Sequence, residues 1–200
     1  FDTHGEYTCF GEPTNEKKDF SNVTKVIDAS KIKISLANTP KHFLEKVLSS
    51  LTPVQKRELF RIINKLKLEM RSGVGPFGID AVRAEVNELD SKTSVPLNFA
   101  LDDLTKMNLF AKVDSPAVMD LLKPGELLVI DLNGIINQQK KQLIVAYFSS
   151  KLFNARRQKR APPFALLVEE AHNFIPEGAA SEYALARPVL QTIAREGRKF

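Results

Sequence analysis

Residues 164–174 read FALLVEEAHNF, and this stretch decides the fold class. Five apolar residues, 164–168, lead directly to two adjacent carboxylates, Glu169 and Glu170. A short, wholly apolar run is typical of a strand covered on both faces, as in a parallel sheet flanked by helices. Open parallel sheets hold their ligands at the carboxyl ends of the strands. We therefore expect this strand to deliver both acids to a ligand-binding edge.

The chain around this stretch alternates between strand and helix patterns. Residues 127–131, LLVID, form another apolar run that ends in an acid. We predict helices over 135–155 and from Pro188 to about Gly197, since proline is favoured at the start of a helix. Strands are also expected at 23–27 and 31–36. Alternating strands and helices predict an α/β fold with a parallel sheet.

The middle of the chain, from about 40 to 112, has a helical pattern. Thr52 and Gln55 have the spacing of a capping box, with Pro53 at the first helical position. The glycine-rich run SGVGPFG at 72–78 ends that helix, and two more helices are expected near 79–89 and 97–110. We therefore divide the chain into the start of an α/β core (1–39), a helical subdomain (40–115) and the rest of that core (116–200).

Composition excludes several classes of protein. The 200 residues are 43% hydrophobic and 26% charged, which argues against disorder. No apolar run approaches the ~18 residues that a membrane span needs, so we expect no membrane partner. The single cysteine, Cys9, excludes an internal disulfide framework and suits a reducing compartment, so we expect a cytoplasmic protein.

The net charge of +5 is unevenly distributed. Residues 41–71 carry eight Lys/Arg and three Glu, and residues 151–160 carry five Lys/Arg and no acid. Basic patches attract phosphates, so either segment is a candidate for nucleic-acid contact. A simpler interpretation stays open for both. Arg57, Arg61 and Lys65 fit the solvated face of a helix, and cations at 151–160 fit a helix C-terminus.

The paired acids also have two interpretations. Nucleotide hydrolysis needs one acid near Mg²⁺ and a neighbour that orients and deprotonates the attacking water. The alternative is that an apolar strand simply ends in solvated acids. Two other strings favour hydrolysis: DTHGEY at 2–7 suits a strand-to-loop junction, and TIAREGRKF at 192–200 places Arg195 and Arg198 at a helix end. An arginine inserted into a neighbouring subunit's site is a common way to neutralise transition-state charge.

The three strings together resemble the HerA-type family of archaeal DNA translocases, in the HerA/FtsK group of RecA-like motor ATPases. They are D-x-HGEY at the start, LLVEEAHNF at 166–174 and IAREGRKF at 193–200. The resemblance implies a partial RecA-like parallel sheet flanked by helices. The helical pattern between the strands itself indicates an inserted or appended all-helical subdomain. It also implies ATP and Mg²⁺ as cofactors and a P-loop NTPase as the class of enzyme.

The resemblance assigns roles to particular residues. Glu169 is expected to be the Mg²⁺-associated acid, acting through water, and Glu170 the catalytic base. Asp2 is expected near the cofactor. Arg195 resembles the arginine finger that acts in trans, Arg198 is the second candidate, and Gln191 is expected to sense the γ-phosphate.

The resemblance further implies a hexameric ring of this protein that moves on double-stranded DNA. Its implied partner is a NurA-type nuclease, and its implied process is DNA-end resection and repair. The family's phosphate-binding loop, GxxxxGK[ST], does not occur in these residues. We therefore expect the chain to be a fragment of a longer protein and to be inactive as an ATP hydrolase by itself.

Other functions stay open at this stage. One is a basic helical module, on an inactive α/β platform, that binds nucleic acid or protein through residues 41–71. Another is a related conjugation or secretion motor. Metal-dependent hydrolysis through His4, Glu6, His42 and His172 has no HExxH or cysteine-pair spacing to support it.

Overall fold

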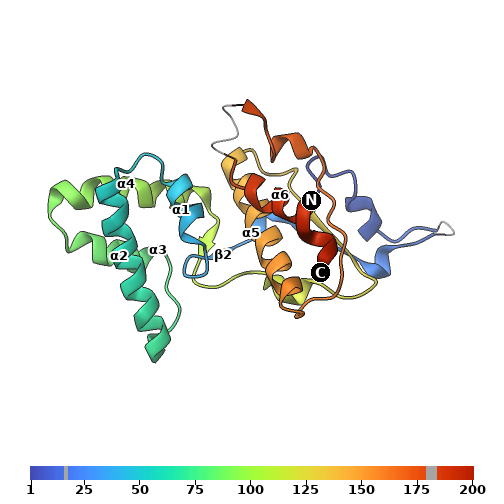
Figure 1. The fold of residues 1–200 in the computed structure, drawn as a ribbon, viewed down its shortest axis with the longest axis horizontal. Coiled ribbons are helices and arrows are strands. Elements are labelled where there is room, and N and C mark those ends of the chain that lie inside the picture. Colours follow the sequence, from blue (N-terminus) through green and yellow to red (C-terminus); the bar gives the residue numbers. More distant parts are fainter. Residues whose placement is uncertain (16–17, 179–183) are drawn as a thin grey trace. The chain divides into compact units, whose positions relative to one another are not determined.

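The computed structural model describes residues 1–15, 18–178 and 184–200 (Figure 1). The described chain mixes helices with small parallel sheets, so the predicted α/β class is confirmed. It divides into two compact units. Unit 1 comprises residues 1–32 and 116–200, and unit 2 comprises residues 33–115.

Unit 1 contains the parallel sheet. Strand β1, Thr24–Asp28, pairs with β4, Leu127–Asp131, in parallel register along its whole length. Residues 1–3 add a further parallel segment on the other side of β4. There Asp2 N donates to Ile130 O at 3.0 Å and Leu132 N donates to Asp2 O at 2.7 Å.

The segment 164–168 lies next to residues 1–3. Phe1 N donates to Leu167 O at 2.8 Å, and Glu169 N donates to Phe1 O at 3.1 Å, which is the bonding of one parallel bridge. The segment is therefore extended and parallel, as predicted. The expectation that it is covered on both faces is wrong, because its residues alternate between half-buried and exposed and Leu167 is 70% exposed. Within the described residues it has this single strand neighbour.

Two longer helices accompany the sheet in unit 1. Helix α5, Gln138–Arg157, is capped by Asn137, whose side chain accepts from Lys140 N, and it buries the rings of Tyr147 and Phe148. Helix α6, Arg187–Glu196, has a proline in its first turn and packs against α5. Short 3-10 helices make the connections: Thr8–Gly11, Ser21–Val23, Ala29–Lys31, Val118–Leu121, Ala171–Asn173 and Gly197–Lys199.

Unit 2 is mainly helical. Its helices are α1 (Lys41–Val47), α2 (Pro53–Glu69), α3 (Ile79–Asn87) and α4 (Ser91–Met107). Strands β2 (Ile34–Ser35) and β3 (Phe110–Ala111) form a short parallel pair, and the π-helical turn Met70–Val74 follows α2.

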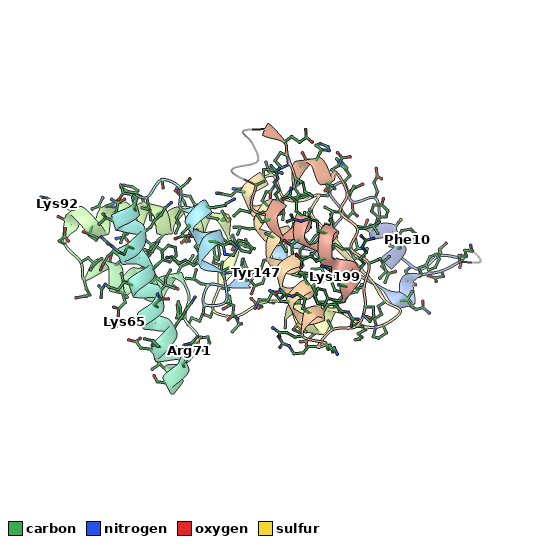
Figure 2. The ribbon with its side chains drawn as sticks, in the orientation of Figure 1. Phe10, Lys65, Arg71, Lys92, Tyr147 and Lys199 are labelled. Carbon is green, nitrogen blue, oxygen red and sulfur yellow. The ribbon has the colours of Figure 1, made fainter. Side chains whose placement is uncertain are left out.

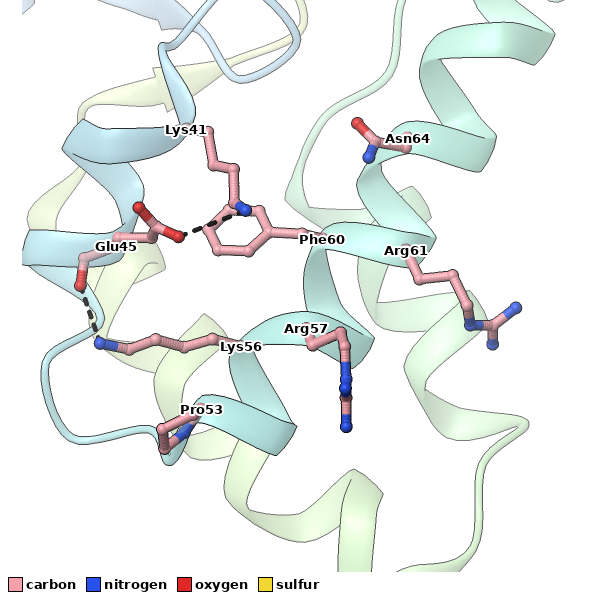
Figure 3. Close-up of a pocket in the computed structure, with 8 residues that line it drawn as sticks. All are labelled: Lys41, Glu45, Pro53, Lys56, Arg57, Phe60, Arg61 and Asn64. Atoms are coloured by element: carbon pink, nitrogen blue, oxygen red, sulfur yellow. Dashed lines mark hydrogen bonds and ion pairs between the residues drawn. The ribbon is translucent and has the colours of Figure 1, made fainter.

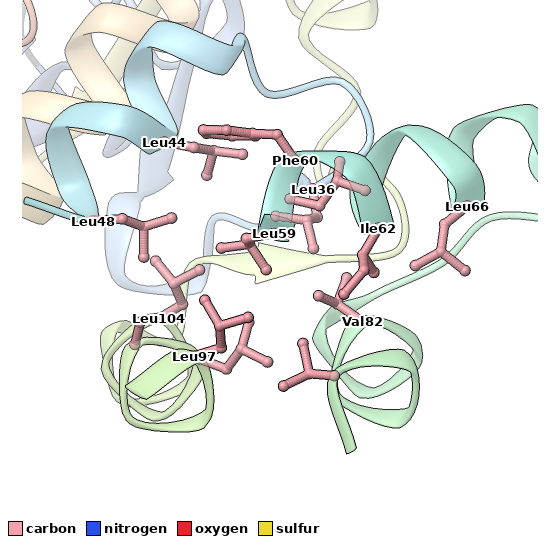
Figure 4. Close-up of a cluster of buried hydrophobic side chains, with 14 of the residues drawn as sticks. Leu36, Leu44, Leu48, Leu59, Phe60, Ile62, Leu66, Val82, Leu97 and Leu104 are labelled. Atoms are coloured by element: carbon pink, nitrogen blue, oxygen red, sulfur yellow. The ribbon is translucent and has the colours of Figure 1, made fainter. Parts of the chain in front are cut away.

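The helices of unit 2 are fixed by capping and by one apolar core. The predicted capping box is present: Thr52 Oγ1 accepts from Gln55 N, and Gln55 Oε1 accepts from Thr52 N. Asp90 caps α4 in a similar way, with bonds from Lys92 N and Thr93 N. The core is shown in Figure 4 and includes the apolar stripe of α2 together with Val82 of α3 and residues of α4.

The two ends of unit 2 are joined to each other. Lys33 N donates to Ser115 O at 2.8 Å, and Ser115 N donates to Lys33 O at 2.8 Å. Unit 2 therefore begins before residue 40, where the sequence pattern first becomes helical. No helix in the part of the chain that the structure describes is long and apolar enough to cross a membrane.

Candidate functional site

Four acids lie in one row across the sheet of unit 1. Asp28 is opposite Asp131, and Asp131 is opposite Asp2. Because residues 1 and 168 are bridged, Glu169 takes the next place in the row, beside Asp2. All four segments are parallel, so their acids share the carboxyl edge where such sheets hold ligands. We call these four residues the carboxyl-edge row.

Asp2 holds the loop that follows it. Its side chain is buried, with 2% of its surface exposed. Oδ1 accepts from Gly5 N at 2.7 Å and Glu6 N at 3.1 Å, and Oδ2 accepts from Tyr7 N at 2.9 Å. Both oxygens are therefore used by backbone donors. The Asp2 side chain therefore fixes the conformation of residues 3–7, which lie beside the carboxyl-edge row.

Glu169 joins two strand ends. Its Oε2 accepts from Thr3 N at 2.6 Å and from His4 N at 3.1 Å, and its backbone oxygen accepts from Thr3 Oγ1 at 3.3 Å. No described residue donates to Oε1. A carboxylate held at one oxygen and open at the other is a suitable partner for the water shell of Mg²⁺, a hard cation that prefers oxygen.

Glu170 lies where the chain turns away from the sheet. Its backbone is left-handed, with φ 48° and ψ 45°, which is uncommon for a residue other than glycine. Such conformations cost about 1–3 kcal/mol and are frequent at active sites. Its Oε2 lies 3.3 Å from His172 Nδ1, and both side chains are accessible to solvent. The turn, rather than strand alternation, separates the directions of the two glutamates.

The acidic loop is attached to the N-terminal part of α5. Gln142, which is buried, donates from Nε2 to Asn173 O at 2.6 Å, and Gln138 donates to the same oxygen at 3.2 Å. The Oε1 atom of Gln142 accepts from Ala186 N at 2.9 Å. One side chain thus fixes both the loop that carries Glu170 and the start of α6.

The predicted arginines lie at the other end of these helices. Arg195 is exposed, and its Nε donates to Gln191 O at 3.3 Å. Arg198 is also exposed and lies two residues before Phe200. The ring of Phe200 packs on the ring of Phe153, near the C-terminal end of α5, with 5.8 Å between the two ring centres. Since α5 has 20 residues, its two ends are about 30 Å apart.

The structure thus brings some predicted site residues together and separates others. Asp2, Glu169 and Glu170 are neighbours at the carboxyl edge. No described hydrogen bond or ion pair connects them with Gln191, Arg195 or Arg198.

Sequence reasoning did not assign Asp28 or Asp131 to the site. Asp131 ends the apolar run LLVID, which is the same signal that identified Glu169, whereas Asp28 ends the more polar strand TKVID. The position of both in one row depends on strand order. Both also bind backbone: Asp28 Oδ1 accepts from Ser30 N at 2.9 Å and Asp131 Oδ1 accepts from Asn133 N at 2.9 Å. Among the described residues, no group of three or more His, Cys, Asp or Glu side chains is arranged to hold a metal by itself.

Comparison with models of protein families shows the family to which this chain belongs. A family model described as "Helicase HerA, central domain" matches residues 1–152. The chain belongs to the HerA helicase central-domain family. It is thus a member of an ATPase and helicase family. The match includes Asp2, Asp28 and Asp131, whereas Glu169 and the residues after it lie beyond the matched range. No curated protein matches the chain.

Proposed function

We propose that this HerA-family chain is the central part of an ATP-driven motor that moves on double-stranded DNA. The observation that carries the proposal is the carboxyl-edge row, in which Glu169 has one open oxygen and Glu170 follows on a strained turn. Family membership supports the ATPase class, and the charge of the acids suits a magnesium nucleotide at this edge.

In the proposed mechanism the two glutamates have different tasks. Glu169 would hold the water shell of Mg²⁺ through Oε1, while the N–H groups of Thr3 and His4 keep the carboxylate in place. Glu170 orients the attacking water and accepts its proton, with His172 beside the carboxylate. Asp2 shapes the loop that supplies those N–H groups. Bound Mg²⁺–ATP supplies the γ-phosphate that the water attacks.

The arginines fit a site in another subunit. Arg195 and Arg198 lie toward the far end of α5 and α6 from the acids of their own chain, and neither forms an ion pair with a described residue. We infer that a guanidinium in this position serves a nucleotide that a second copy binds. We therefore propose a ring of six copies, with Arg195 as the finger, Arg198 as the second candidate and Gln191 as a γ-phosphate sensor.

The proposed biological setting is DNA-end resection and repair together with a NurA-type nuclease. The 200 residues contain no GxxxxGK[ST] motif, whose backbone amides and lysine hold the triphosphate in P-loop enzymes. We expect that motif about 20–30 residues before Phe1 in the complete protein, since a loop, its helix and a strand must fit between them.

The substitution Glu170→Gln tests the mechanism in the protein that contains this loop. We expect ATP binding to persist and hydrolysis to fall about 10²–10⁴-fold, because the amide cannot accept the proton of the attacking water. Nucleotide binding and phosphate release at steady state are the two measurements. Glu177→Gln is the control, since Glu177 is an exposed acid in the same loop. Unchanged hydrolysis in Glu170→Gln would remove this residue from the role.

A further inference from the structure

The fold joins two basic segments that are distant in the sequence. Lys159 and Arg160 follow Gln158, the C-cap of α5, and Arg198 and Lys199 lie in the last 3-10 helix. Figure 2 labels Lys199. The ring of Phe200 packs on Phe153, so the second segment lies against the end of α5. We call these four cations the amino-edge patch, and Arg198 is counted here because Arg195 is the proposed arginine finger. A helix that follows a strand of a parallel sheet runs back toward the amino ends of the strands, so the patch lies opposite the carboxyl-edge row.

Two arginines form the scaffold of this patch. Arg156 donates to Ala161 O at 3.1 Å and also to Phe200 O. The guanidinium of Arg157 lies over the rings of Phe153 and Phe200, 5.8 and 5.7 Å from their centres. A helix-end role therefore accounts for Arg156 and Arg157, which bind carbonyls and rings. It does not account for the four exposed cations beyond the helix.

The amino-edge patch has no acid to neutralise it within the described residues. None of its four side chains lies within ion-pair distance of a described carboxylate, and Arg160 contacts the amide oxygen of Gln158. All four are exposed. A group of unpaired cations creates a positive local potential that attracts polyanions.

The other basic segment, 41–71, differs from the amino-edge patch because several of its cations form ion pairs with acids. Figure 3 shows the groove between α1 and α2, which has a volume of about 640 Å³. In it Lys41 pairs with Glu45 at 3.4 Å, and Lys56 donates to the backbone oxygen of Glu45 at 3.0 Å. Thus Lys41 and Lys56 already have partners, whereas Arg57, which also lines the groove, forms no ion pair with a described residue.

Two cations farther along α2 also form ion pairs with acids of unit 2. Arg61 pairs with Glu58 at 2.6 Å and lowers the pKa of that carboxyl, and Lys65 pairs with Glu85 at 2.6 Å. The two segments looked equivalent as sequences, but three of the eight cations of 41–71, Lys41, Arg61 and Lys65, pair with acids of unit 2, whereas none of the amino-edge patch pairs with a described acid.

We propose that the amino-edge patch binds the phosphate backbone of duplex DNA. Phosphate contacts need exposed cations and no particular base, which is what this surface offers. A single strand is the less suitable occupant, because stacking needs accessible rings, and those of Phe153 and Phe200 are occupied by each other and by Arg157. The contact adds a DNA surface to the proposed motor and does not depend on hydrolysis.

Lys159 allows a test that separates charge from folding. Its backbone is left-handed, with φ 56°, at the residue that follows the C-cap of α5, Gln158. Glycine is the favoured residue at such a position. Lys159→Gly therefore removes a cation and relieves backbone strain together, so the melting temperature should be retained or raised.

The experiment measures binding of this chain to a mixed-sequence duplex of about 30 base pairs by fluorescence anisotropy, without nucleotide, from about 50 to about 200 mM salt. In the double variant Lys159→Gly/Arg160→Gln we expect about tenfold weaker binding at the lower salt. The slope of log K against log salt should also decrease by about 0.9 for each lost phosphate contact.

The control variant is Lys31→Gln/Lys106→Gln, which removes the same charge from two exposed lysines that pair with Asp28 and Asp103. It should bind almost as the unchanged chain does. Equal losses in both variants, or no loss in the first, would overturn the proposal. So would a loss that appears in Arg57→Gln instead, because that result would place the DNA in the groove of unit 2. ATP hydrolysis by the Glu170→Gln variant is a separate measurement. The proposed motor function and the proposed DNA contact can therefore be disproved independently of each other.

Discussion

At the scale of single residues, the site is built from carboxylates that bind backbone N–H groups. Asp2 accepts three such bonds and Glu169 accepts two, each where a strand ends. Charged acceptors make stronger hydrogen bonds than neutral ones, so these loops are held firmly although they contain little apolar surface. Gly5 completes the arrangement, because its φ of +78° turns the chain back toward Asp2.

Gly5→Ala should reveal how closely this loop is packed. An added Cβ would meet Asn133 Nδ2 at 3.2 Å, in addition to the cost of about 1 kcal/mol or more for a left-handed alanine. Gly125→Ala is the matched control, since its φ is +79° and nothing lies within 4 Å of its Cβ. We expect Gly5→Ala to lower the free energy of unfolding by about 1 kcal/mol more than Gly125→Ala. Urea denaturation measures both, and equal losses would show that Asn133 moves aside freely.

At the scale of elements, Gln142 of α5 connects the acidic loop to α6. Its amide donates to Asn173 O and accepts from Ala186 N, and both Gln142 and Ala186 are buried. A glutamine with both ends bonded in this way fixes two elements with a single side chain. The relative position of Glu170 and α6 within unit 1 therefore depends on it.

Gln142→Met should lower the free energy of unfolding by about 1–3 kcal/mol, because it leaves the buried Ala186 N–H without an acceptor. Gln138→Met is the control. Gln138 is exposed and donates to the same Asn173 oxygen, which keeps its bond from Gln142. We expect a change within about 0.5 kcal/mol for the control. Thermal and urea unfolding of the two variants compare them, and similar losses would contradict the special role of Gln142.

Elements with local signals were predictable from the sequence. The capping box of Thr52 and Gln55 and the strand LLVID depend on neighbouring residues, and both are confirmed. The coverage of residues 164–168 was not predictable, because it depends on which strands lie beside them. In the same way, the sequence showed the charge of Arg61 and Lys65, but only tertiary packing brings Glu85 to Lys65. Strand order likewise placed Asp28 and Asp131 in the row.

At the scale of the whole molecule, the sheet unit is discontinuous and the helical unit is continuous. Unit 2 has its own apolar core, built from α1 to α4, and its two ends are bonded to each other. These are the properties of a segment that can fold by itself.

The peptide 33–115 should therefore fold in isolation. We expect a helical far-UV circular dichroism spectrum and one cooperative thermal transition, because the buried residues of this unit contact one another. Thr52→Ala within the peptide should lower its free energy of unfolding by about 0.5–2 kcal/mol through loss of the helix cap. A peptide without a cooperative transition would show that unit 2 needs the rest of the chain.

The bridge between Lys33 and Ser115 also affects the order of events during synthesis. Strand β1 must find β4 across the whole of unit 2, a long loop whose closure costs entropy. If unit 2 folds first, the bridge brings its two ends together, and the open chain shrinks to the short stretches on either side. The ribosome releases unit 2 before β4. A folded unit 2 would therefore hold residues 33 and 115 together and lower the entropy cost of pairing β1 with β4.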